Sequence, residues 1–144
     1  MLSVLLDTTL YRSMALLHIL SAVVAFGPVF LYPGLRRNGE TGTIATMHMR
    51  MTFPALVALW VLGMGLAGIS KPEGASDPVY TMSQTWLAAS IVNWVMLVAV
   101  SWFLIRPSIS DRSDAAESKL AAGVGITHVG LIIGLALMIW KPGF

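Results

Sequence analysis

The chain has 144 residues, of which 56% are hydrophobic and only 11% are charged, and its mean hydropathy is +0.77. A soluble domain of this size cannot bury so much apolar surface, so most of it must face lipid. The nine Lys and Arg residues are scattered rather than gathered into a stripe, which excludes nucleic acid as a partner. The sequence has no cysteine, which excludes disulfides, thiolate metal sites and cysteine nucleophiles.

Four apolar segments are long enough to cross a bilayer, which takes roughly 20 residues of helix. They cover residues 11–32, 47–69, 84–105 and 119–140, with short loops between them. Short loops place consecutive helices antiparallel. The sequence therefore predicts an all-α fold, an antiparallel bundle of four transmembrane helices. It forms a single integral membrane domain over residues 1–144, with both termini on the same side.

Proline residues mark where the predicted helices bend or end. Gly27-Pro28 should kink the first helix, and Pro33-Gly34 should end it. Pro107 should likewise end the third helix. Tyr32, at the end of the first helix, is expected in the belt of aromatic side chains at that membrane interface.

The first helix contains His18 within its apolar stretch. An ionisable group inside a membrane is costly unless it is paired, so His18 is a candidate ligand for haem or a metal ion. The alternative is a structural role, in which the imidazole bonds a nearby hydroxyl or backbone carbonyl. His48, at the start of the second helix beside Arg50, is interpreted as an interfacial residue.

The second helix contains the string Gly63-Met64-Gly65-Leu66-Ala67-Gly68, which matches the glycine pattern of dinucleotide-binding folds. That pattern works only in a turn between a strand and a helix, where backbone amides meet a pyrophosphate. Here it lies inside an apolar span. We therefore interpret Gly63 and Ala67 as a contact between small residues that lets another helix approach.

The third and fourth helices carry further polar and small residues inside the membrane. Asn93 should form a hydrogen bond to another helix. His128 is a second candidate ligand for a cofactor, with the same structural alternative as His18. Small residues at intervals of four, three and four positions predict a packing face, toward either this chain or a second copy: Gly123, Thr127, Gly130 and Gly134.

Basic residues indicate how the chain lies in the membrane. Six of them fall on the side reached after the first and third helices, and three fall on the other side. Because basic residues concentrate in cytoplasmic loops, the pattern predicts that both termini lie outside. The six are Arg36, Arg37, Arg50, Arg106, Arg112 and Lys119, and the three are Arg12, Lys71 and Lys141.

Several short motifs resemble a family of predicted integral membrane proteins of bacteria, a four-helix domain of unknown function. The motifs are residues 17–28 (LHILSAVVAFGP), Thr52-Phe53-Pro54, Gly63-Met64-Gly65, Thr85-Trp86-Leu87 and Arg106-Pro107. The resemblance implies a location in the bacterial plasma (inner) membrane. That family is similar in layout to the copper-resistance D membrane domain and to HemJ, a small haem-containing protoporphyrinogen oxidase. The similarity implies haem b as cofactor and His18 as its ligand.

This sequence departs from the HemJ pattern in two respects. It lacks the Trp-rich continuation of the first helix and a second ligand in the matching helix.

Three classes of function follow from the sequence. They are a haem-binding redox protein that uses His18 or His128, an accessory subunit that packs in a homo-oligomer or larger membrane complex, and a small transporter or metal-handling protein. The sequence identifies no catalytic residue and no metal site.

Overall fold

The computed structural model describes residues 9–71 and 76–143, and this part of the chain is helical without any β-strand. Its helices long and apolar enough to cross a membrane are Thr9–Arg37, Thr41–Gly68, Thr85–Ser110 and Asp114–Trp140. The prediction of a four-helix transmembrane bundle is confirmed. The first and third loops shrink to residues 38–40 and 111–113 because the helices run further than predicted. The predicted second loop includes residues 72–75, which lie outside the described residues.

The first span changes its helical geometry at a proline. It consists of α2 (Thr9–Phe26), the 3₁₀ turn η1 (Pro28–Leu31) and α3 (Tyr32–Arg37). Pro28 has no N–H to donate, and a Cβ on Gly27 would lie 2.7 Å from the Val23 carbonyl oxygen. The α-helix gives way here to a 3₁₀ turn. Pro33-Gly34 does not end the helix, because Pro33 lies in the first turn of α3, where no N–H donor is needed.

The second and third spans each contain a π-helical segment just before a proline. The second span comprises α4 (Thr41–Met47), η2 (His48–Thr52) and α5 (Phe53–Gly68), and the third comprises α6 (Thr85–Ala99), η3 (Val100–Ile105) and α7 (Arg106–Ser110). Because proline has no N–H, the carbonyl four residues before it loses its α-helical donor. In a π-helix, that carbonyl accepts instead from the N–H five residues after it. The third helix therefore continues through Pro107, and the prediction that Pro107 ends it is wrong.

The fourth span is one uninterrupted helix, α8 (Asp114–Trp140). Ser113 caps its start, since the Ser113 hydroxyl oxygen accepts the backbone N–H of Ala116 at 3.2 Å. Beyond its other end, Lys141 adopts a left-handed conformation with φ of 41°. The Pro142 carbonyl then accepts the backbone N–H of Trp86 at 3.1 Å. The segment after α8 therefore covers the start of α6.

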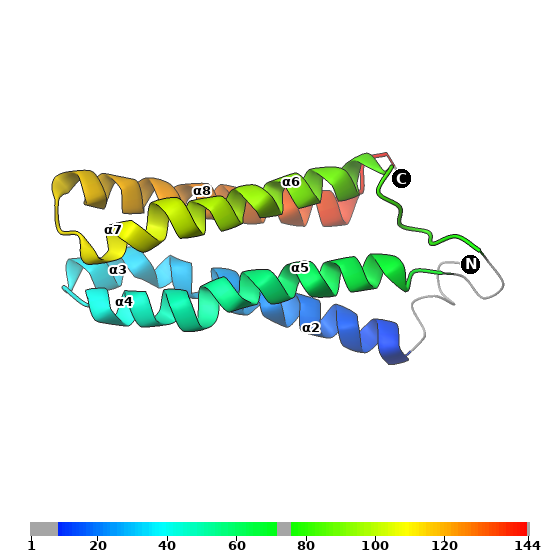
Figure 1. Ribbon diagram of the computed structural model, residues 1–144, viewed down its shortest axis with the longest axis horizontal. Coiled ribbons are helices and arrows are strands. Elements are labelled where there is room, and N and C mark those ends of the chain that lie inside the picture. The colour runs from blue at the N-terminus through cyan, green and yellow to red at the C-terminus, as the bar shows by residue number, and fades with distance from the viewer. Residues whose placement is uncertain (1–8, 72–75, 144) are drawn as a thin grey trace.

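The spans form two antiparallel pairs (Figure 1). α2 lies along α5, and α6 lies along α8. The pairs come together at the end of the bundle that holds α3, α4 and α7, which we name the convergent end. α2 begins and α8 ends at the opposite end, so both ends of the described chain lie on the same side of the bundle.

Buried apolar side chains form three clusters along the bundle. The cluster at the convergent end draws on all four spans and contains Val29, Tyr32, Ile44, Ile105, Ile109, Leu120 and Val124. A middle cluster contains Ala25, Phe26, Ala55, Leu56 and Leu97, and a small one near the opposite end contains Ala67, Trp86 and Leu87. Among the described residues, the cluster at the convergent end thus has fully buried side chains from all four spans, whereas the fourth span adds only the partly buried Leu131 to the middle cluster.

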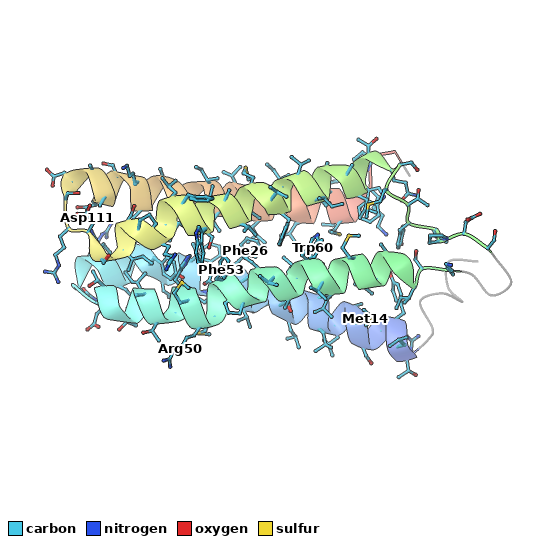
Figure 2. All side chains as sticks on the ribbon, in the orientation of Figure 1. Met14, Phe26, Arg50, Phe53, Trp60 and Asp111 are labelled. Atoms are coloured by element: carbon cyan, nitrogen blue, oxygen red, sulfur yellow. The ribbon has the colours of Figure 1, made fainter. Side chains whose placement is uncertain are left out.

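The outer surface of the bundle is apolar. At most 22% of the most apolar stretch of each span is buried inside the bundle. Large side chains such as Val92, Phe103 and Ile139 are 69%, 76% and 70% exposed. Figure 2 shows side chains projecting outward along both helix pairs. Because a surface of this kind is stable against lipid rather than water, the chain is a multi-pass membrane protein that contacts the bilayer.

Candidate functional site

Three spans contribute polar side chains to one buried group, which we name the His48 cluster: Tyr32, His48, Thr52 and Ser101. Each of these residues is at most 2% exposed. The Tyr32 hydroxyl lies 3.2 Å from His48 Nδ1 and 3.0 Å from the Thr52 hydroxyl oxygen. His48 Nε2 lies 3.1 Å from both the hydroxyl and the carbonyl oxygen of Ser101. Every polar side-chain atom of the cluster therefore has a partner.

The Ser101 carbonyl sets the direction of these hydrogen bonds. A carbonyl oxygen only accepts, so His48 Nε2 carries the proton that points toward it. In neutral imidazole Nδ1 is then an acceptor, and the Tyr32 hydroxyl donates to it. The Tyr32 oxygen in turn accepts from the Thr52 hydroxyl. The chain of donors thus runs from Thr52 through Tyr32 and His48 to Ser101.

Both π-helical segments lie at this cluster. η2 contains His48 and Thr52, and η3 contains Ser101. The backbone N–H of Arg106 donates to the Ser101 carbonyl five residues back, and the second lone pair of that oxygen accepts His48 Nε2–H. π-helical turns are rare in proteins, and here both of them supply polar residues to one cluster. The prolines after them therefore help to place the cluster's polar atoms.

The His48 cluster overturns two predictions from the sequence. Tyr32 and His48 were both expected at a membrane interface, but each is completely buried. The physical reason is that the two side chains satisfy each other inside the bundle, which removes the penalty of burying them. Because the cluster is sealed, it can join three spans but cannot reach a substrate.

His18 lies between α2 and α5. Its ring occupies the space left by a missing side chain, since a Cβ on Gly63 would come 3.0 Å from His18 Cε1. The Nδ1 atom of His18 is buried and has no hydrogen-bonding partner. The backbone of Leu59, on α5, is placed to act on the imidazole as a hydrogen-bonding group.

His128 lies on the opposite helix pair, where α8 meets η1. Its ring stacks on Phe30, with 4.0 Å between ring centroids and 19° between ring planes. The Nε2 atom of His128 is buried and also has no hydrogen-bonding partner. An aromatic neighbour thus fixes the ring while leaving the nitrogen unsatisfied.

The structure does not bring His18 and His128 together. His128 contacts Phe30, which follows His18 by twelve residues, and a helix of that length spans roughly 18 Å. The two imidazoles therefore lie at different depths. Within residues 9–71 and 76–143, no group of three or more His, Cys, Asp or Glu side chains is placed to hold a metal ion.

The small residues predicted on the second span have different neighbours. Gly63 faces α2 through the His18 ring. Gly65 faces the same helix, because a Cβ there would collide with the terminal methyl of Met14. Ala67 instead packs with Trp86 and Leu87 of α6. The second span thus meets the first through its glycines and the third through Ala67.

The small residues predicted on α8 face the third span of the same chain. A Cβ on Gly123 would lie 2.6 Å from Ile105, and one on Gly130 would lie 2.6 Å from Leu97. The Thr127 hydroxyl bonds the Gly123 carbonyl at 2.8 Å, within its own helix. A Cβ on Gly134 would lie 3.5 Å from the Asn93 amide nitrogen. This face is occupied by the chain itself and leaves no surface there for a partner.

Asn93 confirms the predicted hydrogen bond between helices. Its amide donates to the Gly130 carbonyl at 2.9 Å.

The sequence prediction missed the His48 cluster, although two signals were present. Thr52 follows His48 at helical spacing, and Pro54 lies just beyond, where a break in the helix turns both residues inward.

Comparisons of the chain with protein-family models, with curated proteins and with solved structures find no match.

Proposed function

We propose that this chain binds haem b through the imidazole of His18 and has a redox role in a bacterial plasma membrane. The observation that carries the proposal is the unpartnered, buried Nδ1 of His18. The third histidine, His48, has partners on both ring nitrogens. The contrast supports a ligand role for His18 and a structural role for His48. His128 shares the unpartnered state and is the second candidate ligand.

An unpartnered imidazole inside a membrane needs a reason. Burying a polar group without a hydrogen bond destabilises a protein by about 1–3 kcal/mol in mutational series. Coordination to iron would satisfy the nitrogen, and neutral imidazole is a common axial ligand of haem. A haem brings four nitrogen ligands of its own, so a single histidine from the chain suffices. When bound, the haem would supply one-electron chemistry.

The surroundings of His18 hold its ring in place. Gly63 gives the imidazole room against α5, and Met14 lies one turn earlier on α2 and fills the space at Gly65. A larger residue at Gly63 would push the ring away from α5. The chain's own contribution is therefore to fix the imidazole in an apolar setting and to keep water from it.

Absorbance of the purified protein tests the proposal. Protein produced with haem supplied should show a Soret band that His18→Ala abolishes and His128→Ala retains. Thermal unfolding of both variants without haem should show that each remains folded. A band lost only in His128→Ala would move the ligand to His128. A colourless wild-type protein would refute haem binding.

We propose further that the convergent end faces the cytoplasm. Six of the nine basic residues lie on the side of the chain that is reached after the first and third spans. Three of the six lie at the convergent end itself: Arg36, Arg37 and Arg112. Both termini then lie outside. A reporter fused to the C-terminus should be active only outside the cytoplasm. Activity only inside would contradict this orientation.

A further inference from the structure

A cavity of about 190 Å³ lies at the convergent end and is lined mostly by charged side chains. It is separate from all three histidines. Residues from α3, from the start of α4, from the third loop and from the first turn of α8 contribute to it. Its lining consists of Arg36, Arg37, Gly39, Thr41, Arg112 and Glu117.

Arg36 is fixed in position by backbone carbonyls of α7 and of the third loop. Its guanidinium donates to the carbonyl oxygen of Ile109 at 2.7 Å and to that of Asp111 at 2.5 Å. The Asp111 carboxylate bonds the backbone N–H of Ser113 at 2.9 Å, and this hydrogen bond lowers the pKa of the carboxyl group. Arg36 thus joins the first span to the loop before α8 and keeps the wall of the cavity in place.

The guanidinium groups of the other two arginines in the lining are available to bind a ligand. Arg37 and Arg112 are exposed, and neither makes a hydrogen bond or ion pair with the part of the chain that the structure describes. Glu117 is the one acidic residue in the lining. The cavity therefore keeps an excess of two positive charges, and Thr41 adds a hydroxyl group.

We propose that this cavity binds a phosphate group, and that its source is the headgroup of an anionic phospholipid. Guanidinium groups match phosphate because their planar N–H donors bond two oxygens at once. The cavity lies where the spans end, which is the level of the headgroups in a bilayer. Exposed apolar side chains of the first span, Phe30 and Leu31, lie just before α3 and would contact the acyl chains.

Thermal unfolding of the full chain in neutral detergent tests this proposal. The probes are phosphatidylglycerol, phosphatidylcholine and inorganic phosphate, each titrated separately. Phosphatidylglycerol should raise the Tm of the wild type. The double variant Arg37→Gln/Arg112→Gln should keep the wild-type Tm without lipid, because neither side chain has a partner, but should need roughly tenfold more phosphatidylglycerol for the same shift.

Arg50→Gln is the matched control. Arg50 is an exposed arginine of the same region that points away from the bundle and does not line the cavity (Figure 2). This variant should respond to phosphatidylglycerol as the wild type does. If the double variant also responds like the wild type, the cavity is not the site and the proposal is overturned. A shift from inorganic phosphate that depends on Arg37 and Arg112 would support the phosphate site but overturn the lipid source. An equal shift from phosphatidylcholine would overturn the preference for an anionic headgroup.

Discussion

The two ends of the bundle bury their histidines in opposite ways. At the convergent end, all four spans build the core, and both ring nitrogens of His48 have partners within 3.2 Å. Toward the other end, the helix pairs contact each other less, and His18 Nδ1 has no partner. His128, where α8 meets the first span, resembles His18 in this respect.

This difference shows how a membrane protein can use one residue type for two purposes. A buried imidazole with two satisfied nitrogens specifies how helices pack, because any other arrangement would leave polar atoms unpaired. A buried imidazole nitrogen without a partner destabilises the folded protein, and a ligand that bonded this nitrogen would remove the penalty. Histidine depth alone does not separate these roles, whereas the neighbours of each nitrogen do.

The largest effect should come from removing His48. His48→Ala takes away the acceptor of the Tyr32 hydroxyl and leaves a cavity in the best-packed region. We expect a loss of about 3 kcal/mol in the free energy of unfolding, measured by denaturant titration in micelles. A loss no greater than that of His18→Ala would remove the distinction between the two ends.

A smaller effect should follow from overpacking the face of α8. Gly130→Leu would force a side chain against Leu97, which a Cβ alone approaches to 2.6 Å. The expected loss is about 2 kcal/mol in the same titration. Gly125→Leu is the control, because nothing lies within 4 Å of a Cβ there and the new side chain would meet lipid. Equal losses at both positions would show that packing against Leu97 is not the cause, because leucine favours a helix more than glycine does.

The third effect concerns the one polar bond between α6 and α8 that the sequence anticipated. Asn93→Ala removes the donor to the Gly130 carbonyl and should lower the free energy of unfolding by about 0.6 kcal/mol, the average for such bonds in membranes. Ser90→Ala is the matched control, because the Ser90 hydroxyl bonds only the Trp86 carbonyl of its own helix. If Ser90→Ala lowers the free energy of unfolding by the same amount, the hydrogen bond between helices stabilises the protein no more than a bond within one helix.

The smallest effect should be at His128, and its sign is informative. His128→Phe keeps a ring to stack on Phe30 and removes the unpartnered nitrogen. Without haem, the Tm should stay within experimental error of the wild type or rise, because the buried polar atom is gone. A clear fall would mean that His128 has a partner in the membrane, such as a bound water.

The sequence was sufficient to predict the four spans because hydrophobic length is a strong signal. It also predicted the hydrogen bond of Asn93 between helices, and it singled out His18 and His128, which are half-buried and each have one buried ring nitrogen without a partner. The helix ends predicted from Pro33 and Pro107 were wrong, because the effect of a proline depends on where it lies within a helical turn. Local sequence does not show whether a 3₁₀ or π-helical segment will absorb the missing N–H.

The full membership of the His48 cluster could not be predicted for a related reason, although the spacing of His48 and Thr52 was a signal for part of it. Tyr32 and Ser101 are remote from His48 in the sequence, and only the packed bundle brings them within hydrogen-bonding distance. Tyrosine near a helix end is typical of an interface, so the expectation for Tyr32 followed the common case. The depth of a residue in a bundle depends on how far the helix continues beyond it, and α3 places Tyr32 inside.

The contact between Trp86 and Pro142 has a consequence for how the protein is made. The N–H of Trp86 opens the third span, but the carbonyl that accepts it belongs to a residue that leaves the ribosome 56 positions later. The third helix is therefore synthesised before the carbonyl that accepts this N–H exists. Its first turn gains that acceptor only after α8 has been made, so the second helix pair is completed from its late-synthesised end.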